Sequence, residues 1–167
     1  DDYSTAPFNL ATQGQRQPGS AFKPFVLSQA LDSGISPDST WASRKMSHCV
    51  TRKKGKCIEA FEVNNYEDAY AGVRSLRSAT TFSDNSVFAE LGMNIVNSPQ
   101  RSLNIIAETA DRMGIQTDIN DGHPANPAMI LGGLRQGVTP LEMAHAFTTI
   151  GNQGERVSGS LDTEPGD

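Results

Sequence analysis

Apolar residues recur at helical spacing in several stretches of the chain, and this pattern predicts its main helices. The first such stretch covers residues 20–34. Phe22, Phe25 and Leu31 lie along one wide apolar face of this helix, and Gly34 can end it in the left-handed conformation. Pro24 falls in the first turn, where a missing N–H costs little. We therefore expect a helix to begin at Ser20.

The clearest helical pattern lies further along the chain, at residues 98–114. Ser98 is a typical N-cap, Pro99 suits the first helical position, and apolar residues follow at helical spacing as far as Gly114. Thr139 and Glu142 have the spacing of a capping box, which predicts another helix that ends at Gly151. Residues 70–95 are also expected to be helical, on either side of a polar triplet at 83–85.

The remaining segments show no sustained period. Residues 1–19 are expected to form a loop, residues 35–69 a long loop excursion with room for a short hairpin, and residues 152–167 a turn-rich tail. The helical part is expected to extend over residues 70–151. No segment is strand-rich enough to supply a sheet. The pattern thus predicts a mainly α chain that forms one partial domain, whose helices would lack a sheet to pack on.

Composition excludes several classes of function. The 167 residues carry a net charge of −5 without an acidic block, which suits one ordinary globular domain. The basic cluster at residues 52–56 has no interleaved aromatic residues for stacking on bases, so we predict a solvated loop there and no nucleic-acid partner. No apolar run approaches the length of a bilayer span, and any signal or membrane anchor is expected outside these residues.

Cys49 and Cys57 are the only cysteines, and three interpretations of them are open. They could form a local disulfide, half of a metal site, or two free thiols. A zinc site needs further ligands, and only His48 is near in sequence. A disulfide is favoured if the chain lies outside the cytosol, because it would clip a segment with little apolar content. We predict no metal site and no cofactor.

Ser20 and Lys23 are candidates for a nucleophile and its base. Three residues apart at a helix start, they share one face, with the serine near the positive end of the helix dipole. A serine hydroxyl needs a neighbouring base, and a lysine can serve only if it is held neutral. Alone, this spacing is more often a helix cap with a surface lysine.

The triplet Ser83-Asp84-Asn85 changes that interpretation. It follows Lys23 by sixty residues, and Ser-x-x-Lys and Ser-Asp-Asn occur together in serine acyl-transfer enzymes that react with β-lactams. In such a site Ser83 would relay a proton between Lys23 and the leaving amine. The Asn85 amide would bind a carbonyl group of the substrate.

Longer matches make the resemblance specific. RQPGSAFKPF around Ser20, FSDNSVFAELG around Ser83 and GVTPLEMAHAFTTIGNQG near the end resemble class A penicillin-binding proteins, as does the pair Asn65-Tyr66. The resemblance implies the helical part of the α/β transpeptidase fold shared by penicillin-binding proteins and serine β-lactamases, with most of the central sheet missing.

The same resemblance implies a function for the parent domain. It would be a peptidoglycan D,D-transpeptidase in which Ser20 attacks the D-Ala-D-Ala carbonyl of a stem peptide and is also trapped by β-lactam antibiotics. Lys23 and Ser83 would transfer protons, and Asn85 would bind substrate. The resemblance also implies a location on the extracytoplasmic face of the bacterial cell membrane, where Cys49 and Cys57 would pair.

The sequence departs from the family in one respect. The third motif, Lys-Thr-Gly or Lys-Ser-Gly on a strand, is absent, and Lys53-Lys54-Gly55 does not replace it because it precedes the triplet. One oxyanion donor and the anchor for the substrate carboxylate would come from that strand. We therefore expect the isolated chain to be inactive, with the missing part of its own domain as a partner.

Two other functions remain open at this point. A serine β-lactamase shares the first two motifs but needs a carboxylate that activates the deacylating water. Glu90 is too near Asn85 in sequence for that role, and Glu142 is better explained as a helix cap. The second alternative is a non-catalytic sensor module that binds β-lactams without turnover. Slow deacylation without peptide ligation would favour the sensor.

Overall fold

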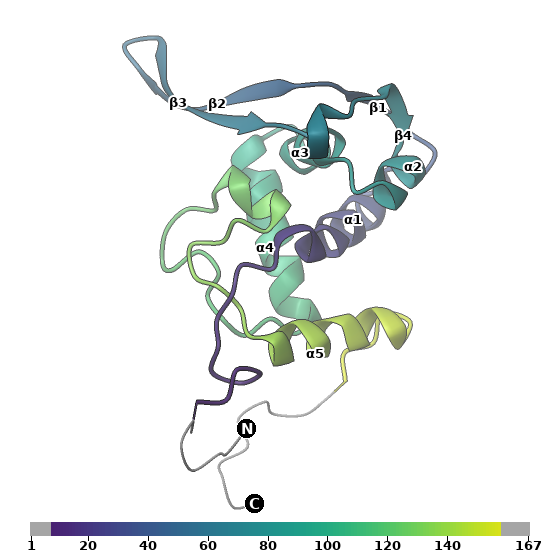
Figure 1. Cartoon of the computed structure of the whole chain (residues 1–167), viewed down its shortest axis with the longest axis vertical. Coiled ribbons are helices and arrows are strands. Elements are labelled where there is room, and N and C mark those ends of the chain that lie inside the picture. The colour runs from purple at the N-terminus through teal and green to yellow at the C-terminus, as the bar shows by residue number, and fades with distance from the viewer. Residues whose placement is uncertain (1–7, 158–167) are drawn as a thin grey trace, which may run out of the picture.

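The computed structural model describes residues 8–157. Residues 1–7 of the expected leading loop and residues 158–167 of the expected tail lie outside this range. Figure 1 shows helix α1 in the middle of the molecule, a long β-hairpin projecting at one end, and α5 at the other. The segment before α1 passes close to the segment before α5, although more than a hundred residues separate them along the chain.

The helices and strands have the following bounds. The α-helices are α1 (Lys23–Asp32), α2 (Leu76–Thr81), α3 (Asn85–Met93), α4 (Pro99–Met113) and α5 (Pro140–Gly151). Short 3-10 turns cover η1 (Gly19–Phe22), η2 (Tyr66–Asp68) and η3 (Pro127–Leu131). The strands are β1 (Thr40–Ser43), β2 (Met46–Lys53), β3 (Lys56–Val63) and β4 (Gly72–Ser75).

The hydrophobic core surrounds α1, which packs against α3, α4 and η3. Phe22, Phe25 and Val26 are fully buried, and Leu91 of α3 and Ile106 of α4 are also fully buried in the same cluster. Full burial of an apolar side chain of this size stabilises a fold by roughly 1.5–3 kcal/mol. The start of α1 is therefore held in place by the most buried part of the molecule.

The two helices with the clearest sequence signals form as predicted. The Ser98 hydroxyl accepts a hydrogen bond from the Arg101 N–H at 3.4 Å, and α4 ends before Gly114, whose φ is 125°. At the start of α5, Thr139 and Glu142 form the full capping box, with the Glu142 carboxylate accepting from the Thr139 N–H at 2.9 Å. These ends are specified locally, by side chains that satisfy free backbone groups.

The loop excursion predicted over residues 35–69, with room for a short hairpin, does contain a hairpin, although its strands of eight residues each make it longer than predicted. Strands β2 and β3 pair antiparallel there, and a two-residue turn at Lys54 and Gly55 joins them, with φ of 49° and 78°. Two successive positive φ values suit the right-handed twist of a tight hairpin. All residues from 51 to 60 are exposed. The strands therefore bury no face there, and no apolar alternation marks them in the sequence.

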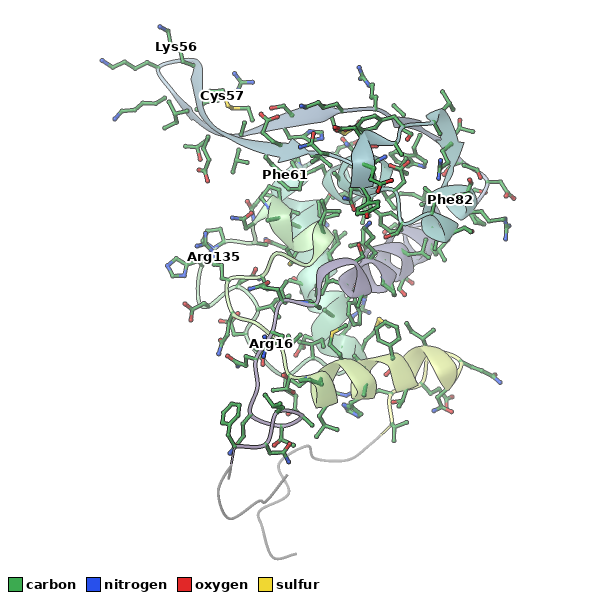
Figure 2. The ribbon with its side chains drawn as sticks, in the orientation of Figure 1. Arg16, Lys56, Cys57, Phe61, Phe82 and Arg135 are labelled. Atoms are coloured by element: carbon green, nitrogen blue, oxygen red, sulfur yellow. A yellow bond between two sulfur atoms is a disulfide. The ribbon has the colours of Figure 1, made fainter. Side chains whose placement is uncertain are left out.

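A disulfide joins Cys49 of β2 to Cys57 of β3, with 5.7 Å between their Cα atoms. The predicted pairing is thus present. In Figure 2, Lys56 lies at the tip of the hairpin and Cys57 lies just behind it, so the bond clips the outer end of the two strands. The basic cluster occupies the turn itself, exposed to solvent.

Two other stretches differ from the predicted helical part at 70–151. Residues 72–75 form β4, which pairs with β1 in the register Thr40↔Ser75, and α2 begins only after it. Residues 114–139 contain only the short turn η3. Gly, Pro and Asn interrupt the apolar pattern there, and the backbone forms local turns together with a bonded pair to the distant Arg16 at Val138. Between residues 8 and 157, no helix is long and apolar enough to cross a membrane.

Candidate active site

Ser20 lies on the 3-10 turn η1 and not in the α-helix that was predicted to start with it. The helix α1 begins three residues later, at Lys23, whose N–H donates to the Ser20 carbonyl group. Pro24 at the second helical position and the tighter preceding turn account for the shift. Ser20 is exposed, whereas the Lys23 side chain is almost completely buried, with 4% of its surface accessible.

Lys23 is the point where the first two motifs meet. Its Nζ atom donates to the Ser83 carbonyl oxygen at 2.7 Å, to Ser83 Oγ at 2.9 Å and to Asn85 Oδ1 at 2.7 Å. These three acceptors use all three hydrogens of an ammonium group. The fold thus brings three of the four predicted site residues into direct contact across a separation of sixty residues in sequence.

The environment of Lys23 weakens its hold on a proton. Burial lowers its pKa from 10.5 to about 8, although the negative charge of Asp84 acts in the opposite direction. The Phe88 ring lies against the amine, with 5.2 Å between Nζ and the ring centroid. A lysine with this pKa is neutral in an appreciable fraction of molecules near neutral pH, as a general base must be.

The backbone of the triplet directs its two outer side chains toward Lys23. Ser83 has a φ of 52°, a left-handed conformation that is uncommon for residues other than glycine and that often occurs at functional sites. Asn85 donates from Nδ2 to the Asn64 carbonyl at 2.9 Å, which turns its oxygen toward Lys23. The second Nδ2 hydrogen remains for another acceptor.

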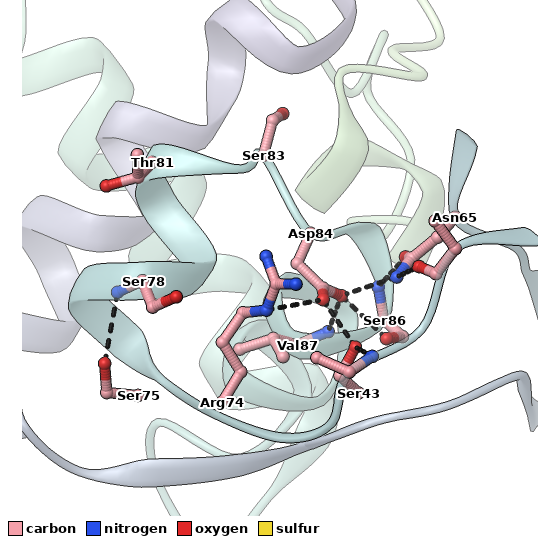
Figure 3. A network of polar contacts seen from close by, with 12 residues as sticks. Ser43, Asn65, Arg74, Ser75, Ser78, Thr81, Ser83, Asp84, Ser86 and Val87 are labelled. Atoms are coloured by element: carbon pink, nitrogen blue, oxygen red, sulfur yellow. Dashed lines mark hydrogen bonds and ion pairs between the residues drawn. The ribbon is translucent and has the colours of Figure 1, made fainter. Parts of the chain in front are cut away.

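Asp84, between these two residues, points the other way and anchors the triplet (Figure 3). Its buried carboxylate accepts hydrogen bonds from Ser43 Oγ at 2.6 Å, Ser86 Oγ at 2.7 Å, Asn65 Nδ2 at 3.0 Å and the Val87 N–H at 3.1 Å, and Arg74 Nε lies at 3.6 Å. Burial raises the pKa of Asp84, but the hydrogen bonds outweigh it and hold the pKa below 3.8. The carboxylate also caps the N-terminus of α3.

Replacement of Asp84 by Asn should destabilise the domain by about 2–3 kcal/mol at pH 7. In the parent the donors share a charged carboxylate, whereas the amide of the variant would point an N–H₂ group at some of them. The pKa of Asp84 is lower in the folded state, so its contribution is complete above the unfolded pKa of about 3.9 and is lost as pH falls through the folded pKa. Urea unfolding at pH 7 and pH 3 should therefore show a smaller difference between variant and parent at pH 3.

Asp38→Asn is the matched control for that measurement. Asp38 pairs with Arg77 at 3.2 Å, and both side chains are mostly exposed. Such a surface pair contributes at most about 1 kcal/mol. Equal losses for the two variants at pH 7 would contradict the anchoring role of Asp84.

The structure does not join Ser20 to Lys23 directly. Within residues 8–157, no hydrogen bond links the Ser20 hydroxyl to the Lys23 amine, and the Ser20 N–H has no intramolecular acceptor. An exposed hydroxyl beside a free N–H is the arrangement that an acyl-transfer nucleophile requires, because the N–H can bind the developing oxyanion.

Most residues that anchor Asp84 carry no recognisable signal in the sequence. Ser43 and Arg74 come from segments without a recognised motif, and their role depends on the β1–β4 pair that the hydrophobic pattern did not reveal. Asn65 was part of a noted Asn-Tyr pair. Its side chain accepts from the Ser86 N–H at 3.0 Å and donates to Asp84, which explains the asparagine.

Comparison with known proteins places this arrangement in a family. The sequence model of the penicillin binding protein transpeptidase domain matches residues 2–163. The chain belongs to this family. The resemblance drawn from the motifs is thereby confirmed, as is the expected fold, a part of the α/β transpeptidase domain.

The curated relatives of this transpeptidase-domain chain are much longer proteins. Penicillin-binding protein 1A of Neisseria flavescens is 34% identical over 158 residues, which cover 94% of this chain and 18% of the relative. Penicillin-binding protein 2D of Bacillus subtilis is 28% identical over 157 residues, or 93% of this chain and 20% of the relative. The chain thus spans about a fifth of the length of these relatives.

Solved structures agree with the assignment of the fold. Penicillin-binding protein 1A of Haemophilus influenzae superimposes with a TM-score of 0.71 at 29% identity, over 89% of this chain and 20% of that one. PonA1 of Mycobacterium tuberculosis in complex with penicillin V has a TM-score of 0.69 at 24% identity, over 86% of this chain and 36% of that one. The second likeness supports the fold alone.

Two further acidic residues of this transpeptidase-domain chain are already engaged elsewhere. The Glu142 carboxylate is occupied by Thr139 and by the N–H groups of Gln116 and Thr117, so it acts as a cap, as expected. Glu90 lies in α3, 3.6 Å from His48 Nε2. Within residues 8–157, neither carboxylate forms a hydrogen bond or ion pair with Lys23, Ser83 or Asn85.

Proposed function

We propose that this chain is the nucleophile-bearing part of a serine D,D-transpeptidase that cross-links peptidoglycan and reacts with β-lactam antibiotics. The observation that carries the proposal is the contact of the buried Lys23 amine with both Ser83 and Asn85. Lys23 lies three residues after the exposed Ser20. The name of a curated relative, penicillin-binding protein 1A of Neisseria flavescens, supports the same activity.

The reaction follows from the positions of these groups. Neutral Lys23 takes the hydroxyl proton of Ser20 as Ser20 Oγ bonds to the D-Ala-D-Ala carbonyl carbon of a stem peptide. When the C–N bond breaks, the proton passes from Lys23 through Ser83, 2.9 Å away, to the departing amine of the terminal D-Ala. An acceptor amine then attacks the acyl-enzyme, and the proton transfers run in reverse to restore Ser20.

Asn85 supports the proposed substrate, and the disulfide supports the proposed compartment. The free amide hydrogen of Asn85 suits a peptide carbonyl of the stem peptide, while its oxygen stays on Lys23. A β-lactam takes the place of the peptide, and its ring amide is the bond that breaks. The Cys49–Cys57 disulfide suits the extracytoplasmic face of a bacterial membrane, where disulfides persist.

Labelling of two protein lengths with a fluorescent penicillin tests this proposal. A longer protein that includes a Lys-Thr-Gly strand should form a stable covalent adduct, whereas residues 1–167 alone should react at least about a hundredfold more slowly, because a second oxyanion donor contributes about that much. Co-refolding of the chain with a segment that carries the strand should restore labelling. Rapid stoichiometric labelling of the 167 residues alone would show that the helices form a sufficient site.

A further inference from the structure

We propose that Gln17 and Gly132 are positioning residues for Ser20, holding the turn that carries the nucleophile against the segment at residues 132–138. The inference rests on Ser20 being the acylated residue, as proposed above. Neither residue touches Lys23, Ser83 or Asn85, and their effect would come entirely through the backbone of η1.

The first contact is a two-point clamp made by the Gln17 side chain. Its Nε2 donates to the Leu134 carbonyl at 2.8 Å, and its Oε1 accepts from the Leu134 N–H at 2.6 Å. Glutamine is the side chain that can donate and accept in this way at this length. The side chain thus pairs with a backbone as another strand would, and it fixes residue 17 relative to a segment 117 residues further along the chain.

Arg16, the residue before Gln17, adds a second set of bonds between the same two segments. The Arg16 N–H donates to the Val138 carbonyl at 2.9 Å, and the Val138 N–H donates back to Arg16 at 3.0 Å. Figure 1 shows the two segments running side by side between η1 and α5. Leu134 and Val138 are buried, so Gln17 and Arg16 bond to a segment that is fixed in the core and not to a free loop.

The second contact lies one residue before the nucleophile. Gly132 packs directly on the Gly19 backbone, and a Cβ at position 132 would overlap the Gly19 carbonyl oxygen and nitrogen. Gly132 also has a φ of 78°, which side chains other than glycine rarely adopt. Between the two contacts only Pro18 intervenes, and its ring fixes φ. The path of the chain into Ser20 therefore has very little freedom.

This restraint matters because of what Ser20 must do. Its Oγ has to meet the carbonyl carbon while its own N–H points at the developing oxyanion, and both directions depend on the backbone of η1. The buried Phe22 and Phe25 fix the turn from its C-terminal side. Gln17 and Gly132 fix it from the N-terminal side, which the helix packing leaves open.

The test is the kinetics of penicillin acylation in the longer protein that includes the Lys-Thr-Gly strand. Gln17→Ala should lower the acylation rate constant at saturating penicillin by roughly tenfold to a hundredfold, the loss typical of a displacement of about 1 Å, with little change in the half-saturating concentration. Gln17→Glu replaces the donor with a carboxylate oxygen that faces the Leu134 carbonyl oxygen, so its loss should be at least as large. Gly132→Ala should lose at least as much as Gln17→Ala.

Two matched controls separate positioning from general effects. Gln136→Ala removes a glutamine of the same segment whose side chain, within residues 8–157, hydrogen-bonds only to Gln15, at 3.5 Å, and it should react like the parent. Gly55→Ala imposes the same φ of 78°, but a Cβ there would meet nothing within 4 Å. The difference between Gly132→Ala and Gly55→Ala therefore reports the contact with Gly19 and not backbone strain alone.

The outcomes distinguish this inference from the proposed function. A purely structural role would lower the melting temperature and the labelled fraction but leave the rate constant of the labelled protein unchanged, which would overturn the inference. Parent-like rate constants for both Gln17→Ala and Gly132→Ala, with Ser20 still labelled, would also overturn it while the proposed function stands. Failure of the unsubstituted longer protein to label at Ser20 would overturn both.

Discussion

Ser20→Ala should abolish covalent labelling by penicillin in the longer protein, because the substitution removes the attacking oxygen. We expect fewer than about one adduct per thousand molecules. In the proposed mechanism the exposed Ser20 hydroxyl oxygen forms the ester. The Oγ and the carbonyl oxygen of Ser83 both accept hydrogen bonds from the Lys23 amine. No substitute nucleophile is therefore expected. Gel fluorescence after incubation with a labelled penicillin measures the result.

Ser28→Ala serves as the control for this loss. Ser28 is half-buried in α1, the helix that begins at Lys23, and lies on a later turn than Lys23. Its removal should leave labelling unchanged. If Ser20→Ala retained full labelling while the control behaved normally, the nucleophile would have been misassigned.

Lys23→Ala should slow acylation of Ser20 by about a hundredfold to ten-thousandfold, the usual contribution of a general base. In the parent, acylation should rise with pH and level off above about 8, because only the neutral amine accepts the serine proton and the Lys23 pKa is about 8. The variant should lose this step in the pH profile. Stopped-flow acylation between pH 6 and pH 10, roughly the range around that pKa, measures both effects.

An exposed lysine provides the comparison. Lys45 lies between β1 and β2, exposed to solvent, and Lys45→Ala should keep both the rate and the pH profile of the parent. A profile in Lys23→Ala that still rises through pH 8 would assign the titration to another group and contradict the role of Lys23 as the base.

The sequence predicted those parts of the fold that local signals specify. Helix α4 and the start of α5 were predictable because Ser98 and Thr139 cap them through bonds within a few residues. The proximity of Lys23, Ser83 and Asn85 was predictable because their motifs are specific and occur in family order. Their direct contact in the fold agrees with that prediction.

The parts that could not be predicted depend on partners distant in sequence or on exposed strands. The hairpin β2–β3 buries almost no face, so its residues show no alternation of apolar and polar positions. The anchor of the triplet joins Asp84 to Ser43, Asn65 and Arg74, which only the tertiary fold brings together. The packing of Gly132 on Gly19 is of the same kind, because a glycine that permits a close approach looks like any other glycine in a sequence.

The site of the covalent adduct tests the central claim most directly. After incubation of the longer protein with penicillin, proteolysis and mass spectrometry should locate the acyl group on the peptide that contains Ser20, and fragmentation should assign it to that side chain. The account predicts one adduct, at Ser20, which disappears in Ser20→Ala. An adduct on Ser83 or on any other serine, with Ser20 unmodified, would contradict it.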